Sequence, residues 1–221
     1  MLNLAVPSDG SLYKPTLGLL KSCNMELSRL NDRSYTAKIP SVSGVTVHFQ
    51  RASTITTSVE NGSVDMGIVG RDQFLEKTRH GGNSSIVIHN LGYGQSNLVI
   101  GVPDFWMDVR SVGDLADVAI EFKSCHEELI RVATKYSRLV EEFLLENGIS
   151  YFSMVKADGA IEAMPLLGTA DIIADISSTG NTMRANRLKT IRGGTIMQSQ
   201  ACVVVNSSQL EISHQRNILA K

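Results

Sequence analysis

Short apolar segments alternate with helix-like patterns along the first half of the chain. Apolar runs and strict apolar–polar alternation predict strands at residues 3–7, 45–52 and 63–70. Apolar side chains at helical spacing predict helices at residues 14–23 and 53–62. The second helix is expected to begin at Ser53, a favoured capping residue, and to end at a glycine, which is the usual order for a helix.

The second half of the chain repeats this alternation. Strands are expected at residues 98–103, 131–136, 149–155, 170–176 and 197–206. Helices are expected after Thr182 and at residues 108–116, 137–148 and 160–168. Strands that alternate with helices predict an α/β fold with mainly parallel sheets.

Two stretches about a hundred residues apart share one plan, which suggests an internal repeat. In residues 58–70 and 164–176, a helix end is followed by a glycine, two residues, an aspartate and an apolar strand. The repeat favours two similar α/β lobes, although any helix–glycine–strand unit produces the same pattern. The expected architecture is that of the type II periplasmic binding proteins, with a cleft between the lobes.

The boundaries of these lobes follow from where the chain can cross between them. Residues 91–97 contain two glycines, which let the backbone bend freely, and are the expected first crossing. The chain is expected to return along the helix after Thr182. Lobe I is therefore predicted as residues 1–92 with 184–221, and lobe II as residues 93–183.

Composition and charge narrow the possible classes of protein. The chain has 221 residues, of which 43% are hydrophobic and 19% charged, so it can build a sizeable core. A net charge of −1 gives no excess of positive charge to attract nucleic acid or an anionic membrane. Three scattered cysteines argue against a disulfide framework or a zinc site. No signal peptide or membrane span is visible, so a soluble cytoplasmic protein is expected.

The most informative segment, residues 171–188, reads DIIADISSTGNTMRANRL. An apolar strand gives way to small hydrogen-bonding residues around a glycine, and a helix follows. Backbone amides of such a loop, together with its hydroxyls and the positive end of the helix, are suited to a phosphate group. The segment is not a Walker loop, because the chain contains no GxxxxGK[ST].

Acidic residues beside this loop restrict the ligand further. Asp171 and Asp175 lie four positions apart on the predicted strand, so their side chains share a face. A carboxylate repels a phosphate unless the ligand also carries hydroxyl donors or a metal ion. A sugar phosphate meets this condition. The alternative is that Asp175 only caps the next helix and that the serines form a solvated turn.

Several blocks of the chain together resemble ATP phosphoribosyltransferase, the first enzyme of histidine biosynthesis. They are FQRASTITTSVENG, VDMGIVGRD, RVATKYSRLVEEFL and GAIEAMPLLGTADIIADISSTGNTMRANRLKTI, which occur in this order and cover most of the chain. The acid–x–x–S–T–G–x–T signature in the last block is specific to the family. The resemblance implies an enzyme that joins N1 of ATP to C1 of the ribose of phosphoribosyl pyrophosphate and releases pyrophosphate.

The resemblance also implies roles for individual residues. Asp175 would hold the ribose hydroxyls, and the loop would hold the 5′-phosphate through Ser177, Ser178, Thr179, Gly180, Asn181 and Thr182. Contacts to ATP or pyrophosphate would come from Arg51, Asp72, Glu162 and Lys135. No dedicated general base is expected, because N1 of adenine is unprotonated at neutral pH. Mg²⁺ would arrive on the pyrophosphate rather than in a protein cage.

The first loop departs from the family pattern, which usually has Lys-Gly-Arg after the first strand. This chain has Ser8 and Asp9 before Gly10, and Ser11 in place of the arginine. Losing two cations and gaining an anion is expected to weaken the binding of a polyphosphate. Lys14 or Lys21 in the next helix are candidates to compensate.

The position of Lys221 soon after the last predicted strand resembles the short form of the family. Short-form enzymes work in a hetero-oligomer with a regulatory subunit similar to a histidyl-tRNA synthetase, so such a partner is expected. Two other readings stay open: a non-catalytic two-lobed module that binds a small anion, and a subunit that only supports assembly.

Overall fold

The chain forms two compact units in a computed structural model that describes residues 1–31, 34–78, 82–157 and 159–208. Unit 1 consists of the described residues of 1–95 together with residues 199–208. Unit 2 is the uninterrupted segment 96–198. The residues beyond 208, which the sequence pattern assigned to lobe I, lie outside the described residues.

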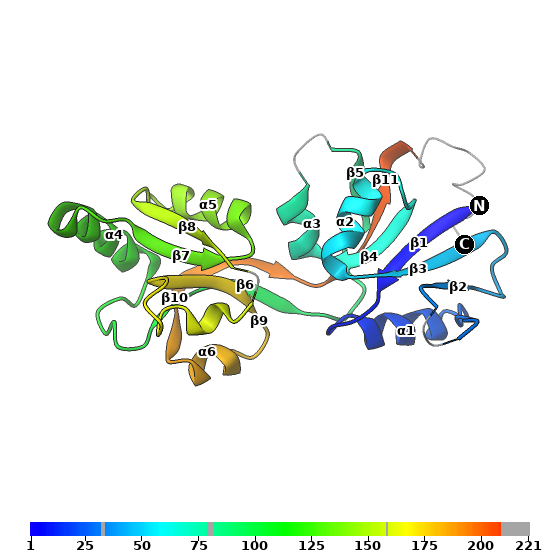
Figure 1. Cartoon of the computed structure of the whole chain (residues 1–221), viewed down its shortest axis with the longest axis horizontal. Coiled ribbons are helices and arrows are strands. Elements are labelled where there is room, and N and C mark those ends of the chain that lie inside the picture. The colour runs from blue at the N-terminus through cyan, green and yellow to red at the C-terminus, as the bar shows by residue number, and fades with distance from the viewer. Residues whose placement is uncertain (32–33, 79–81, 158, 209–221) are drawn as a thin grey trace. The chain divides into compact units, whose positions relative to one another are not determined.

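Unit 1 contains a six-stranded sheet in the order β2-β3-β1-β4-β11-β5 (Figure 1). The strands are β1 (Leu2–Pro7), β2 (Thr36–Lys38), β3 (Val45–Gln50), β4 (Met66–Gly70), β5 (Ser84–Ile88) and β11 (Ala201–Asn206). The helices are α1 (Tyr13–Ser22), α2 (Ala52–Glu60) and α3 (Arg71–Lys77). Strand β1 is parallel to β3 and β4, whereas β11 is antiparallel to β4 and β5.

Unit 2 contains a five-stranded sheet in the order β10-β6-β9-β7-β8. Its strands are β6 (Ser96–Pro103), β7 (Ile130–Thr134), β8 (Phe152–Lys156), β9 (Ile172–Ser177) and β10 (Leu188–Ser199). Its helices are α4 (Val112–His126), α5 (Ser137–Glu146), α6 (Asn181–Ala185) and the 3₁₀ turn η1 (Ile161–Ala163). Strand β7 is parallel to β8 and β9, and β6 is antiparallel to β9.

The predicted two-unit α/β fold is confirmed, but several elements differ from the sequence pattern. Parallel strand pairs form the groups β3-β1-β4 and β8-β7-β9, whereas β2, β11 and β6 pair antiparallel with their neighbours β3, β4 and β9. The helix expected at residues 160–168 is only the turn η1, because Pro165 lacks the amide that a helix interior needs. The strand expected at residues 197–206 is two strands separated by Gln200. Helix α2 begins after Arg51, so Ser53 lies inside the helix and does not cap it.

The internal similarity seen in the sequence corresponds to a repeated strand order. The order β3-β1-β4-β11 in unit 1 matches β8-β7-β9-β6 in unit 2. The two similar segments end in β4 and β9, which occupy equivalent places in the two sheets. The repeat is therefore a property of the fold and not a coincidence of composition.

The repeated aspartate performs the same task in both units. In unit 1, Asp65 accepts hydrogen bonds from the backbone amide of Asn3 at 2.6 Å and from its side chain at 3.2 Å. In unit 2, Asp171 accepts from the backbone amide of Arg131 at 2.7 Å and forms a salt bridge with its guanidinium at 2.8 Å. The bonds to Asp171 raise the pKa of Arg131. Each aspartate fastens the start of one strand to its parallel neighbour.

The two crossings of the chain lie at residues 95/96 and 198/199. The first falls within the predicted segment 91–97. The second differs from the predicted return at residue 184, because β10 pairs with β6 and so belongs to the sheet of unit 2. The pattern of residues 184–196 gave no strand, so all of β10 except its last three residues was missed.

Of the three cysteines, Cys202 is fully buried in β11 and the other two, Cys23 and Cys125, are exposed. Burial raises the pKa of Cys202 to about 12. We therefore expect iodoacetamide at pH 8 to alkylate Cys23 and Cys125 and to leave Cys202 unmodified in the folded protein. Mass spectrometry of the digested chain measures this, and labelling of all three at one rate would contradict the buried position of β11.

Candidate functional site

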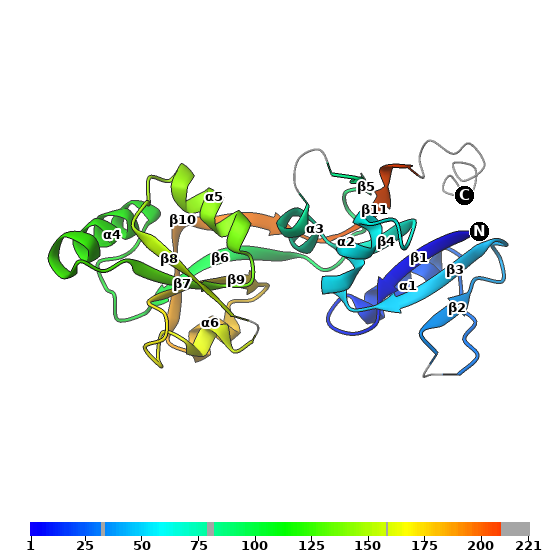
Figure 2. The ribbon, with the colours of Figure 1, turned by 45° about the horizontal axis from the view of Figure 1, so that its top comes forward.

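The polar loop predicted from the sequence joins β9 to α6 in unit 2 (Figure 2). Ser178 and Thr179 are exposed in the loop, as are Asn181 and Thr182 at the start of α6. Gly180 has a φ of 71°, a left-handed conformation that glycine adopts without strain. Helix α6 has only five residues, so the positive helix end expected from the sequence contributes little here.

Hydrogen bonds inside the loop leave part of its backbone unused. The amide of Gly180 donates to Oγ of Ser177 at 3.0 Å, and the amide of Asn181 approaches the hydroxyl of Thr179 at 3.4 Å. Within the described part of the chain, the amides of Ser178, Thr179 and Thr182 have no acceptor. The loop therefore presents amides and hydroxyls together on exposed residues, as an anion site requires.

Asp175 lies inside β9, two residues before the loop begins. Its side chain is half-buried, and Oδ1 accepts a hydrogen bond from the amide of Ile176 at 2.8 Å. The residue that caps α6 is Gly180, and it provides no side-chain cap. The alternative that Asp175 serves as the cap of this helix is therefore wrong.

Arg184 is a loop contact that the sequence analysis did not name. From the last turn of α6, Nη2 donates to the carbonyl of Thr179 at 3.0 Å and to Oδ1 of Asn181 at 2.6 Å. A basic residue two positions after Thr182 was the only available signal, and the sequence alone does not show which way its side chain folds.

Two further predicted residues lie at the same sheet edge as the loop. Strands β9, β7 and β8 are parallel neighbours, so their carboxyl ends meet at one edge. Lys135 directly follows β7 and is exposed, and Glu162 lies half-buried in η1, which follows β8. The structure thus brings Lys135, Glu162 and the loop to one edge of unit 2.

The corresponding edge of unit 1 carries exposed cations. Arg51 follows β3 and precedes α2, and Arg71 follows β4. Lys14 lies in the first turn of α1, next to the loop that follows β1. Lys21 lies about 10 Å further along this helix, away from that loop, and forms an exposed salt bridge with Glu26.

Asp72 does not match its predicted role as a contact to ATP or pyrophosphate. The residue is only 8% exposed, and its carboxylate accepts a hydrogen bond from the hydroxyl of Ser199. The amide of Asp72 donates back to the same hydroxyl at 3.0 Å. This carboxylate joins Ser199 to the start of α3 within unit 1, so it serves the fold.

Gln50 is a second residue that the sequence analysis missed. It ends β3, immediately before Arg51, and its side-chain oxygen is buried without a hydrogen-bond donor in the described residues. Unpaired buried acceptors are uncommon and cost free energy unless a ligand or water supplies the donor. The sequence gives no signal for this residue, because the burial of its side-chain oxygen is visible only in the structure.

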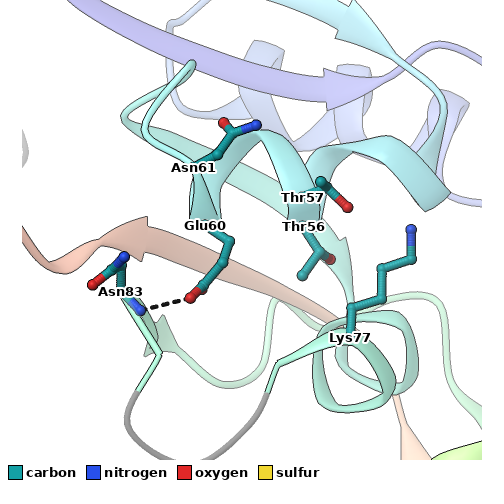
Figure 3. Close-up of a pocket in the computed structure, with 6 residues that line it drawn as sticks. All are labelled: Thr56, Thr57, Glu60, Asn61, Lys77 and Asn83. Carbon is teal, nitrogen blue, oxygen red and sulfur yellow. Dashed lines mark hydrogen bonds between the residues drawn. The ribbon is translucent and has the colours of Figure 1, made fainter.

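A surface pocket in unit 1 lies along helix α2 (Figure 3). It is lined by Thr56, Thr57, Glu60, Asn61, Lys77 and Asn83. Glu60 accepts from the amide of Asn83 at 2.6 Å and from the hydroxyl of Ser84. Lys77 donates to the carbonyl of Ser53. Both charged groups are therefore engaged by the protein itself, and the pocket offers no free charge to a ligand.

The described residues contain neither a group of three or more potential metal-ligating acids, histidines and cysteines nor a helix long and apolar enough to cross a membrane.

Comparisons with known proteins agree with the sequence resemblance. The family described as "HisG: ATP phosphoribosyltransferase" matches residues 51–221. An ATP phosphoribosyltransferase from Brucella anthropi is 40% identical over 205 residues, which cover 92% of this chain and 89% of that protein. One from Chelativorans sp. is 40% identical over 207 residues, covering 92% and 90%.

Solved structures show the same fold. The ATP phosphoribosyl transferase (HisG:HisZ) complex from Thermotoga maritima contains a chain with a TM-score of 0.75 and 22% identity, covering 100% of this chain and 94% of that one. The alkanesulfonate-binding protein SsuA from Xanthomonas axonopodis pv. citri gives a TM-score of 0.54 at 14% identity, covering 99% and 69%. The expected architecture of periplasmic binding proteins is thereby confirmed.

Proposed function

The chain belongs to the ATP phosphoribosyltransferase family, and from that premise we propose that residues 175–182 bind phosphoribosyl pyrophosphate (PRPP) for transfer to ATP. The activity of the family is the first step of histidine biosynthesis, in which N1 of ATP displaces pyrophosphate from C1 of the ribose. The observation that carries the proposal is the loop after β9, where exposed hydroxyls lie beside amides that lack acceptors in the described chain.

The two ends of the proposed site suit the two ends of a ribose phosphate. Amides of Ser178, Thr179 and Thr182 and the loop hydroxyls would donate to the 5′-phosphate. Asp175 precedes the loop and would accept hydrogen bonds from the ribose hydroxyls through its half-buried carboxylate. A site that accepts at one end and donates at the other fixes the direction in which the sugar lies.

The chemistry needs positioning more than acid–base catalysis. N1 of adenine already carries a lone pair at neutral pH, so no side chain has to remove a proton. Holding the two reactants in line can supply about 7–11 kcal/mol of the barrier. The remaining requirement is to stabilise the charge that develops on the leaving pyrophosphate.

Charged residues at the two sheet edges are proposed to meet this requirement. Arg51 and Lys135 are exposed cations at strand ends, and they would contact the phosphates of ATP or the pyrophosphate. Glu162 is proposed as a further contact at the edge of unit 2. Mg²⁺ bound to the pyrophosphate would neutralise part of its charge, and we propose that it arrives with the substrate.

A regulatory partner is also proposed. The solved structure from Thermotoga maritima is a complex of two kinds of subunit, HisG and HisZ. We propose that this chain works with a subunit similar to a histidyl-tRNA synthetase in a hetero-oligomer in the cytoplasm.

Calorimetric titration with PRPP and Mg²⁺ tests the proposed loop directly. The parent chain is expected to bind, and the variant Asp175→Asn, Thr179→Val to bind about thirtyfold more weakly, because it loses hydrogen bonds at both ends of the ribose phosphate. A binding measurement is preferable to an activity assay, since a missing partner and a dead site would both give no product.

A matched variant controls for general effects of the substitutions. Asp117→Asn, Thr169→Val changes an exposed aspartate on α4 and an exposed threonine outside the loop, and it should leave PRPP affinity within twofold. If the parent binds PRPP and the loop variant binds equally well, the phosphoribosyl site lies elsewhere. If the parent binds no PRPP, the chain acts as an anion-binding or assembly subunit instead.

A further inference from the structure

Arg184 is placed to control the conformation of the loop that we propose for PRPP. The inference rests on that proposed function and concerns how the loop is held. Among residues 172–186, Asp175 and Arg184 are the only charged residues. The carboxylate precedes the loop, and the guanidinium lies against its middle.

The peptide between Thr179 and Gly180 is held from both of its polar sides. Its amide donates to Oγ of Ser177 at 3.0 Å, and its carbonyl accepts from Nη2 of Arg184 at 3.0 Å. The same Nη2 donates to Oδ1 of Asn181 at 2.6 Å, so one nitrogen joins the two residues that flank the glycine. Removing the guanidinium would leave both the carbonyl of Thr179 and the side-chain oxygen of Asn181 without this donor.

Gly180 itself is fitted to this arrangement. A Cβ atom built on it would lie 3.0 Å from Nη1 of Arg184, so the guanidinium packs against the glycine backbone. The glycine therefore provides the space for the arginine in addition to the left-handed φ of 71°. Within the described residues, Nε and Nη1 of Arg184 have no acceptor, which leaves donors and positive charge beside the loop.

We propose that Arg184 is a positioning residue for PRPP. It sets the orientation of the Thr179–Gly180 peptide and supplies positive charge beside the bound 5′-phosphate.

Three variants and two ligands test this proposal. Arg184→Met removes the donors and the charge, Arg184→Lys keeps the charge and a donor group, and Arg138→Met removes a partly exposed arginine of α5 as a matched control. Calorimetry measures the dissociation constants of PRPP and of ribose 5-phosphate, which shares the 5′-phosphate but lacks the pyrophosphate.

Arg184→Met is expected to weaken the binding of both ligands by the same factor, about tenfold, with an unchanged melting temperature. Arg184→Lys should bind both ligands at least about threefold more tightly than Arg184→Met. Arg138→Met should bind both ligands within twofold of the parent. Equal affinity in Arg184→Met and the parent would overturn the proposal. So would a loss confined to PRPP, a lysine variant as weak as the methionine variant, or the same loss in Arg138→Met.

The same titrations separate this proposal from the proposed function. If the parent binds PRPP and the variant Asp175→Asn, Thr179→Val binds it much more weakly, the loop is the phosphoribosyl site. The Arg184 variants then decide only the role of Arg184. If the parent does not bind PRPP, the proposed function fails before any Arg184 variant is considered.

Discussion

Replacing Asp72 by alanine is expected to lower the free energy of unfolding by about 3 kcal/mol and to leave the affinity for ATP unchanged. The carboxylate is buried and accepts from Ser199, and the Asp72 amide donates back to that hydroxyl. Removing the side chain leaves the Ser199 hydroxyl without its carboxylate acceptor where water has little access. Urea denaturation followed by circular dichroism measures the stability, and calorimetry measures the affinity for ATP.

Two further variants show whether the pair acts as a unit. Asp117→Ala changes an exposed aspartate of α4 and should alter stability by less than about 0.5 kcal/mol. The double variant Asp72→Ala, Ser199→Ala should cost less than the sum of the single variants, because both remove the same hydrogen bonds. A weaker affinity for ATP with unchanged stability would instead restore Asp72 to the binding site.

Two glycine-to-alanine variants in unit 1 are expected to change stability in opposite directions. A Cβ atom at Gly67 in β4 would lie 2.4 Å from Cγ2 of Ile55 and 3.2 Å from Cγ2 of Val59, both fully buried on α2. Branched side chains in a helix have little rotamer freedom, so α2 itself would have to move away from the sheet. We expect Gly67→Ala to lower the free energy of unfolding by about 3 kcal/mol.

Gly18 provides the matched control for this variant. It lies within α1, and a Cβ atom there would meet nothing within 4 Å. Gly18→Ala is expected to raise the free energy of unfolding by about 0.5–1 kcal/mol, because alanine favours the helix. Equal urea midpoints for the two variants would contradict the close packing of α2 on β4.

The strands that the sequence predicts best are those buried on both faces. The segments around β1, β4 and β9 are nearly continuous apolar runs, as parallel strands covered on both faces should be. Strand β10 gave no such signal, because it lies at the edge of its sheet, has two glycines and exposes many of its side chains. Its pairing with β6 depends on residues far away in the chain.

In the candidate site too, features set by neighbouring residues could be predicted from the sequence, and features set by distant residues could not. The loop after β9 is recognisable from its own residues, since small hydroxyl side chains around a glycine are unusual after a buried strand. The role of Asp72 was not recognisable, because its partner Ser199 is 127 residues away. Arg184 is close in sequence to the loop, yet its contacts with Thr179 and Asn181 depend on a side-chain rotamer.

The place of β11 in its sheet also bears on how the chain folds as the ribosome makes it. All six residues of β11 are buried, and the strand pairs with both β4 and β5 although it is synthesised after the whole of unit 2. The nascent chain therefore completes unit 2 while β4 and β5 still have unpaired edges, which invite association with other chains. Synthesis therefore favours folding of unit 2 first. Unit 1 stays exposed to association with other chains until residue 206 has left the ribosome.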